Sequence, residues 1–226
     1  MKHTTHLAAA AALAFASLPA LAANTTYTNR ALFLAAAGSV QTDTYENAGY
    51  VFNQSDAVMS AVLGLTKYRT TGFLNNDLVF NPGGSNHNYC AGCNGTFELD
   101  FTAASLGGAG GISAAGFDFE NVPGFVGGNT PYFAFVTFAD SSTTSFSLAA
   151  SADFVYPLDQ FFGITSTVGI TKIHLGLVNG GSSQVGGFAI DNLSVGAAAV
   201  PEPSTYAMLL AGLAGLTLMA RRKSAV

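Results

Sequence analysis

The sequence predicts an all-β fold for the body of the chain, a jelly-roll-like β-sandwich with one short N-terminal helix. Short stretches of alternating hydrophobic and polar residues recur along the body. They are separated by Gly, Asn, Ser and Pro, a spacing typical of sandwiches. Phenylalanine (18) and glycine (26) are plentiful while charged residues make up 9% of the chain, so neither a charged disordered chain nor a coiled coil fits. Residues 23–199 are enough for one domain with a sizeable core.

The first segment, residues 1–22, has the three parts of a secretory signal peptide. Lys2 precedes an apolar run over residues 7–18, and Ala20 and Ala22 are the small residues that signal peptidase reads. We therefore predict a signal-peptide helix that is removed after Ala22, and export of the remaining chain.

One helix is expected early in the body, in "RALFLAAAG". Asn29 is a helix-capping residue type directly before this apolar stripe, and Gly38 stands where a helix would stop. Helical periodicity does not return until Tyr206, so no second helix is predicted within the body.

Five stretches alternate clearly enough to predict strands, because successive side chains of a strand point to opposite faces. They are "GTFELDF", "AAGFDFENV", "YFAFVTFADSSTTSFSL", "ITKIHLGLV" and "GFAIDNLSV". The alternation predicts core side chains at Phe97, Leu99, Phe101, Phe117, Phe119, Phe133, Phe135, Phe138, Phe146, Leu148, Phe188, Ile190 and Leu193. In "ITKIHLGLV" either Ile173, Leu175 and Leu177 or the alternate face is buried. The turn residues Asp140-Ser141-Ser142 predict a hairpin within the third stretch. Roughly ten strands of this length match a two-sheet sandwich.

Four acidic side chains fall on the faces opposite to these core positions: Glu98, Asp100, Asp118 and Glu120. A solvated sheet face is their expected role, since alternation places polar residues wherever an outer face is wet. The alternative is a pair of carboxylates for glycoside hydrolysis. The sequence has no G-x-S-x-G elbow, H-E-x-x-H motif or phosphate loop. We therefore predict no catalytic residue and expect a non-enzymatic protein.

The charge of the body argues against nucleic acid as a partner. Residues 23–199 contain four basic and twelve acidic side chains, a net charge of −8. A surface of this sign repels phosphate backbones, so divalent cations are the better candidates.

Cys90 and Cys93 are the two cysteines of the chain. Export implies an oxidising compartment, which favours a local disulfide between them. A zinc site that adds His87 is the alternative, although a fourth ligand is not evident.

Further side chains have two interpretations. Tyr45, Tyr50, Tyr68, Tyr89 and Tyr132 could stack on sugars, but packing in the core or at its rim is expected by default. In the same way, His174 is expected to be an ordinary sheet residue with a hydrogen-bond partner.

The end of the chain, residues 200–226, has three parts in a fixed order. Pro201-Glu202-Pro203 comes first, an apolar run over residues 206–220 follows, and the basic cluster Arg221-Arg222-Lys223 comes last. This arrangement resembles the PEP-CTERM sorting signal of Gram-negative bacteria, which is also described as the ice-binding protein C-terminal domain. The resemblance implies recognition by exosortase, processing near the Pro-Glu-Pro motif and transfer to the cell surface or release. It also implies a bacterium that makes exopolysaccharide and biofilm matrix.

The length of the apolar run agrees with a removable anchor. Fifteen or so residues at 1.5 Å rise span about 22 Å, short of the roughly 30 Å hydrocarbon core. Such a C-terminal transmembrane helix holds a precursor in the inner membrane with help from its flanks, and the basic cluster fixes the tail on the cytoplasmic side. A permanent single-span anchor is the alternative.

The body resembles the β-rich ectodomains that precede this signal in other proteins, through "RALFLAAAG", "CAGCNGTFELDF", "AAGFDFENV" and "GFAIDNLSV". The last of these stretches also looks like the closing strand of jelly-roll carbohydrate-binding modules. There, the aspartate after the hydrophobic pair helps to hold a structural calcium. The likeness makes Asp191 the candidate metal ligand and calcium the one ion to consider, and no other cofactor is implied.

Taken together, the sequence predicts an exported cell-surface or extracellular protein with a structural or adhesive role linked to exopolysaccharide. Its expected partners are the secretion machinery, exosortase and the polysaccharide. A calcium-stabilised carbohydrate-binding module and a glycan-active enzyme are the two alternatives.

Overall fold

The computed structural model describes most of the body and little of the end segments. The described residues are 23–52, 54–72, 77–80, 87–93, 95–122, 131–152, 157–181, 187–197 and 211–212. Ala23–Ala199 forms one compact unit. Among the described residues, no helix has the length and apolarity needed to cross a membrane. The signal-peptide helix and the apolar run over 206–220, apart from the helical residues 211–212, lie outside the described residues.

The prediction of an all-β fold is confirmed. The described elements include two helices, α2 (Arg30–Ala37) and α3 (Asp56–Val62). The strands are β1 (Asn24–Tyr27), β2 (Val40–Asp43), β3 (Lys67–Thr70), β4 (Asp77–Phe80), β5 (Asn88–Ala91), β6 (Phe97–Asp100), β7 (Ile112–Val122), β8 (Phe133–Phe138), β9 (Thr143–Ser147), β10 (Gln160–Gly176) and β11 (Gly187–Gly196). They form one continuous sheet with the order β3-β6-β10-β7-β11-β5-β4. In addition, β1 and β8 pair with β10, β2 pairs with β11, and β9 pairs with β8.

The long strand β10 joins the two halves of this sheet. Its first half pairs with β1 and β7, and its second half pairs with β6 and β8. The register with β8 shifts between Ile170 and Lys172, directly after Gly169, whose φ is +97°. A side chain at Gly169 would also meet the carbonyl oxygen of Gly110 at 2.1 Å, so this bend requires glycine. The sheet thus changes direction without interrupting the strand.

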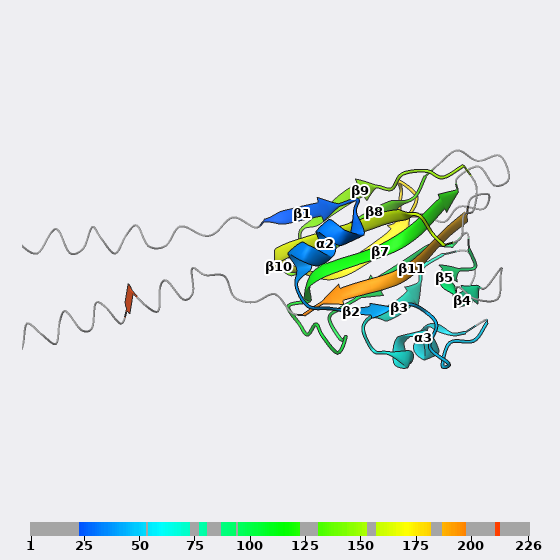
Figure 1. Ribbon diagram of the computed structural model, residues 1–226, viewed down its shortest axis with the longest axis horizontal. Helices are drawn as coiled ribbons and strands as arrows, with labels where there is room; N and C mark the ends of the chain where they lie inside the picture. The colour runs from blue at the N-terminus through cyan, green and yellow to red at the C-terminus, as the bar shows by residue number, and fades with distance from the viewer. Residues whose placement is uncertain are drawn as a thin grey trace, which may run out of the picture. The chain divides into compact units, whose positions relative to one another are not determined.

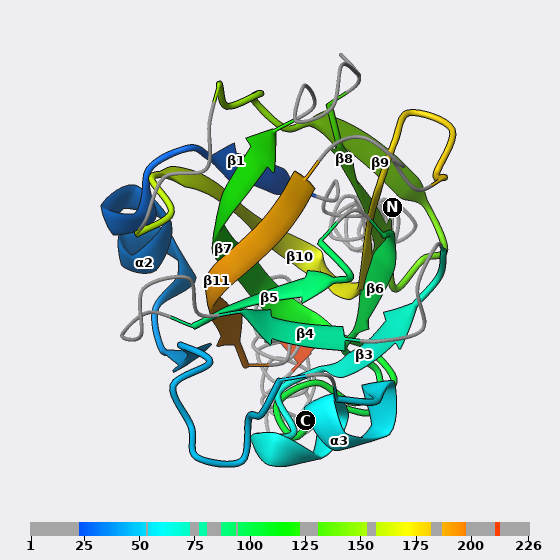
Figure 2. The same ribbon diagram turned by 90° about the vertical axis from the view of Figure 1, so that its right-hand side faces the viewer.

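The curled sheet encloses one main core. In Figure 2, β6 and β8 lie across from β7 and β11, and the buried cluster between them draws on all of these strands. Its members include Phe97, Leu99, Phe101, Phe117, Phe119, Phe138, Phe188, Ile190 and Leu193, as the alternation predicts, and Ile173 and Leu175 from the first of the two faces considered for their stretch. The predicted hairpin is also present, since β8 pairs with β9 around Asp140-Ser141-Ser142.

Helix α2 covers the outer side of β7 and β10, as Figure 1 shows. It begins where predicted, because the Asn29 side chain accepts a hydrogen bond from the backbone N–H of Leu32 at 3.1 Å. The fully buried ring of Phe33 packs over Gly116 and Gly163, which are cross-strand partners. A Cβ atom at Gly163 would lie 2.7 Å from this ring. The two glycines therefore leave the space on the sheet that the Phe33 ring of α2 fills.

Helix α3 corrects the prediction of a single helix in the body. It is short, and Met59 is its one buried side chain. It packs beside β3 through polar contacts: the Asp56 carboxylate accepts hydrogen bonds from the backbone N–H and the hydroxyl of Thr70, at 3.0 and 2.9 Å. A seven-residue segment with one buried side chain shows too little periodicity for the sequence to reveal it.

Strand faces differ from the prediction at two places. In β8 the core side chains are Ala134, Val136 and Phe138, while Phe133 and Phe135 point outward and are half-buried. The second place concerns the acids, because Glu98 is 7% exposed and Glu120 is fully buried, so neither lies on a solvated face. The prediction failed for Glu120 because β7 is covered on both faces. It failed for Glu98 because the side chains of Arg69 and Lys172 lie against this carboxylate on the side of β6 that faces away from the core. Alternation alone does not distinguish such covered positions from solvated ones.

Candidate functional site

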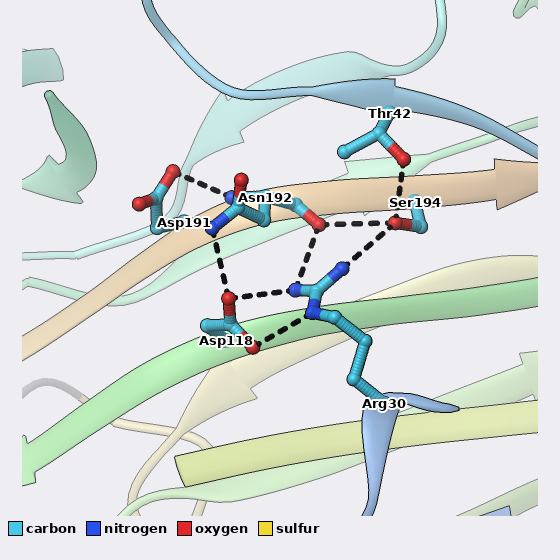
Figure 3. A network of polar contacts seen from close by, with 6 residues as sticks. All are labelled: Arg30, Thr42, Asp118, Asp191, Asn192 and Ser194. Carbon is cyan, nitrogen blue, oxygen red and sulfur yellow. Dashed lines mark hydrogen bonds and ion pairs between the residues drawn. The ribbon is translucent and has the colours of Figure 1, made fainter. Parts of the chain in front are cut away.

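Arg30 organises a polar network between α2 and the sheet (Figure 3). Its guanidinium binds the Asp118 carboxylate through two contacts, Nε to Oδ1 at 3.1 Å and Nη2 to Oδ2 at 2.7 Å. It also donates to the Ser194 hydroxyl at 3.2 Å and to the carbonyl of Asn192 at 3.3 Å. The Asn192 amide, held at φ +50°, donates to Asp118 at 2.8 Å. The network ties α2, β7 and β11 together, and we assign it a structural role.

Asp191, the candidate calcium ligand, lies at the edge of this network. Its carboxylate accepts a hydrogen bond from the backbone N–H of Asn192 at 2.6 Å and is 8% exposed (Figure 3). The pKa of Asp191 is raised from 3.8 to about 7, chiefly because burial disfavours the charged carboxylate; the negative charges of Asp118 and Glu46 add to this effect, and the hydrogen bond from Asn192 opposes it. The described residues contain no group of three or more His, Cys, Asp or Glu side chains placed to hold a metal ion.

The raised pKa of Asp191 predicts a pH-dependent stability. The folded protein holds a proton on this group between pH 3.8 and about 7 that the unfolded chain releases, so stability falls as pH rises through this range. We expect Asp191→Asn to reduce this slope in urea melts at pH 5 and pH 8, while Asp140→Asn in the exposed β8–β9 turn keeps it. An unchanged slope in Asp191→Asn would contradict the prediction.

The same variants test calcium. If Asp191 is a ligand, calcium raises the melting temperature of the unaltered protein and a chelator lowers it, whereas Asp191→Asn responds to neither. A melting temperature that calcium leaves unchanged would remove Asp191 as a ligand.

The sulfur atoms of Cys90 and Cys93 lie 2.01 Å apart, at disulfide distance. The zinc site considered above would use Cys90 and Cys93 as thiolates, and a disulfide between them leaves neither. His87 binds Glu46 instead: its backbone N–H and its Nδ1 lie 2.7 Å from the two carboxylate oxygens. The Cys90–Cys93 segment contributes to a small buried cluster with Leu158 and Ala189. These contacts support a structural role.

The five tyrosines considered for sugar stacking are core residues. Tyr45, Tyr50, Tyr68, Tyr89 and Tyr132 are between 0% and 7% exposed. Several of them share hydrogen bonds, such as the one between the Tyr45 and Tyr68 hydroxyls at 3.0 Å. Packing in the core, as expected by default, therefore describes these five rings better than a sugar-stacking surface.

The candidate binding surface is the side of β3, β6, β10, β8 and β9 that faces away from the core, here called the outer face. Cross-strand pairing sets two rows of side chains on it. One row is Lys67, Asp100, Lys172, Thr137 and Thr143, and the other is Arg69, Glu98, His174, Phe135 and Ser145. The outer face thus combines charges of both signs with hydroxyls and aromatic rings.

Contacts within the outer face fix its central side chains. The Glu98 carboxylate oxygen Oε1 lies 3.1 Å from Nη2 of Arg69 and 3.0 Å from Nζ of Lys172. His174 donates from Nε2 to the carbonyl of Gly180 at 3.0 Å, as expected of an ordinary sheet residue, and its ring lies 5.8 Å from that of Phe135.

A hollow of about 540 Å³ opens at the β3 end of the outer face. The residues that line it come from α3, β3, β6 and β10, and they are Asp56, Ala57, Ser60, Lys67, Tyr68, Arg69, Glu98, Asp100 and Lys172. The volume lies within the range of small-ligand sites. The outer face with this hollow is the candidate binding site.

Comparison with known proteins identifies the end of the chain. Residues 199–223 match the family model of the PEP-CTERM protein-sorting motif, so the predicted sorting signal is confirmed. Such a motif implies exosortase-dependent export to the cell surface, with exosortase as the processing partner. No curated protein and no solved structure matches the chain.

The sequence contained a signal for the outer face that was missed. In each of three strands, two polar or charged residues are spaced two apart, so both lie on the same face of the strand. The pairs are Lys67/Arg69, Glu98/Asp100 and Lys172/His174. Pairing of β3 with β6 and of β6 with β10 was needed to bring the three pairs together.

Proposed function

We propose that this protein is a non-enzymatic structural or adhesive component of the cell surface or extracellular matrix. The observation that carries the proposal is the match of residues 199–223 to a sorting motif that directs proteins to this location. In the proposed route the signal peptide starts export, the apolar run over 206–220 holds the precursor in the inner membrane, and exosortase removes the tail. The delivered part is the β-sheet body.

We further propose that the body is a jelly-roll-like sandwich. What supports this is that β10 bends from one half of the sheet into the other and that both halves close over one core. Sandwiches of this kind present one broad outer face on each half, which suits attachment to an extended polymer.

Binding is favoured over glycan hydrolysis because three of the four strand carboxylates are committed elsewhere. Asp118 is paired with Arg30, Glu120 is fully buried, and Glu98 is held between two cations. A carbohydrate-binding role through the outer face is the second candidate. It is favoured by the half-buried rings of Phe133 and Phe135, of which the second lies beside the His174 ring.

Intact mass analysis of the surface form tests the sorting route. With exosortase present, the surface form is expected to lack residues 206–226, and without it the tail is expected to remain. Replacing Pro201, Glu202 and Pro203 together with alanine should also retain the tail, whereas Ser204→Ala should not. A tail that persists in both strains would overturn the proposal.

A further inference from the structure

The basic side chains of the body are concentrated at one place. Residues 23–199 contain four Lys and Arg residues against twelve acids. Three of the four, Lys67, Arg69 and Lys172, line the hollow, and the fourth, Arg30, is bound in the network of Figure 3. A body with a net charge of −8 thus gathers its remaining cations around 540 Å³ of open space.

The acids of the hollow are satisfied by the protein. Asp56 accepts from Thr70, and Asp100 accepts from the backbone N–H and hydroxyl of Thr102 at 2.8 and 2.6 Å. Glu98 is held by two cations. These contacts fix the three carboxylates and help to position β3, β6 and α3. The threonine donors are neutral, so Asp56 and Asp100 keep their charges, and the three acids of the hollow balance its three cations.

The cations keep unused donors. Arg69 makes one ion pair, through Nη2, and its side chain is 63% exposed. Lys67 is exposed, and no hydrogen bond or ion pair joins its ammonium group to another described residue. Since Lys carries three donors and Arg carries five, the hollow offers charged donors that no described acceptor fills. A ligand with anionic oxygen atoms would complete it.

The rest of the outer face indicates which kind of molecule would bear the anionic group bound in the hollow. From the hollow at β3 to Phe135 on β8 the face crosses three strand spacings, about 14 Å. At its β8 end lie the Thr137 hydroxyl, which can exchange hydrogen bonds with sugar hydroxyls, and the rings of Phe133 and Phe135, whose faces can contact apolar ring C–H groups. The neighbouring acids and the negative body favour singly charged carboxylates over multiply charged phosphates.

We propose that the hollow binds the carboxylate groups of an acidic polysaccharide, with Lys67 and Arg69 as the principal contacts and the sugar chain running across β6 and β10 toward Phe135. This inference deepens the proposed surface role and rests on it for the place where the polymer is met.

The proposal is tested by measuring the affinity of the purified full-length chain, kept in mild detergent, for polygalacturonate. We expect measurable affinity that falls as salt is raised, because the contacts are between opposite charges. Fully methyl-esterified polygalacturonate is the matched ligand without charge and should bind at least about tenfold more weakly, the effect of losing one charge-assisted contact. Lys67→Gln with Arg69→Gln should weaken polygalacturonate binding by a similar factor.

One control variant, one further variant and a stability measurement make the result specific. Ser39→Glu with Gln41→Glu, at two exposed positions, one directly before β2 and one within it, lowers the net charge by two, as Lys67→Gln with Arg69→Gln does, but lies away from the hollow and should bind normally. Phe135→Ala should weaken binding to polygalacturonate while leaving the salt dependence in place. Melting temperatures of the Lys67 and Arg69 variants should stay close to that of the parent, since both side chains are exposed.

Three outcomes would overturn the inference: no binding to polygalacturonate, equal binding to the methyl ester, or equal binding to inorganic polyphosphate. None of them affects the sorting test, because removal of residues 206–226 is measured by mass on cells. A protein that is sorted normally and fails to bind would therefore disprove the ligand and leave the surface role standing.

Discussion

Replacing Phe33 with alanine is expected to lower the free energy of unfolding by about 3 to 5 kcal/mol, the range for removing a buried phenylalanine ring. The ring is fully buried and contacts Phe161 and Tyr27, with ring centroids 5.4 and 5.9 Å away. It also fills the space over Gly116 and Gly163, which have no side chains of their own to occupy the cavity. Urea denaturation followed by circular dichroism measures the change.

Leu32→Ala is the matched control, because this side chain is on the same helix and 65% exposed. It should cost less than about 0.5 kcal/mol. Gly163→Ala should itself be destabilising, since its Cβ would meet the Phe33 ring at 2.7 Å, and it should cost less when combined with Phe33→Ala. Equal costs for Phe33→Ala and Leu32→Ala would show that the helix does not pack on this glycine pair.

Replacing Arg30 with methionine is expected to cost about 2 to 3 kcal/mol, because a partly buried carboxylate loses its charge-assisted hydrogen bonds. Asp118 is 16% exposed at its side chain and would keep only the Asn192 amide as a partner. Asn192 and Ser194 would also lose the contacts that hold β11 to α2. Thermal and urea melts of the variant measure this loss.

Arg69→Met is the control, since Arg69 also pairs with a buried acid but is 63% exposed. It should cost less than about 1 kcal/mol. Asp118→Asn should reduce the cost of Arg30→Met in a double-mutant cycle, because the stranded charge is then absent. Additive losses in that cycle would contradict direct coupling between the two side chains.

Local sequence signals predicted what depends on neighbours along the chain. The Asn29 cap, the β8–β9 turn and the alternation of β6, β7, β10 and β11 are local, and each is present in the structure. The sorting motif was predicted for the same reason, as its three parts are contiguous. By contrast, α3 was missed because one buried side chain in seven residues makes no periodic pattern.

The candidate binding site was beyond local reasoning. Lys67, Glu98 and Lys172 are far apart in the sequence and meet only through the pairing of three strands. The prediction that Phe133 and Phe135 face the core was wrong. Both faces of β8 carry apolar residues, so alternation does not indicate which face is buried, and in the folded protein Ala134 and Val136 are the residues packed in the core.

The all-β class, the capped helix and the C-terminal address of this protein are all encoded in short stretches of chain, because periodicity, capping and sorting motifs act over a few neighbouring residues. Folding of the whole body was needed to establish which acids are buried, that Arg30 binds Asp118, and that three cations share one hollow. Those outcomes depend on strand order and on the cover over each sheet face. Both arise from contacts between residues distant in the chain, which no local pattern encodes.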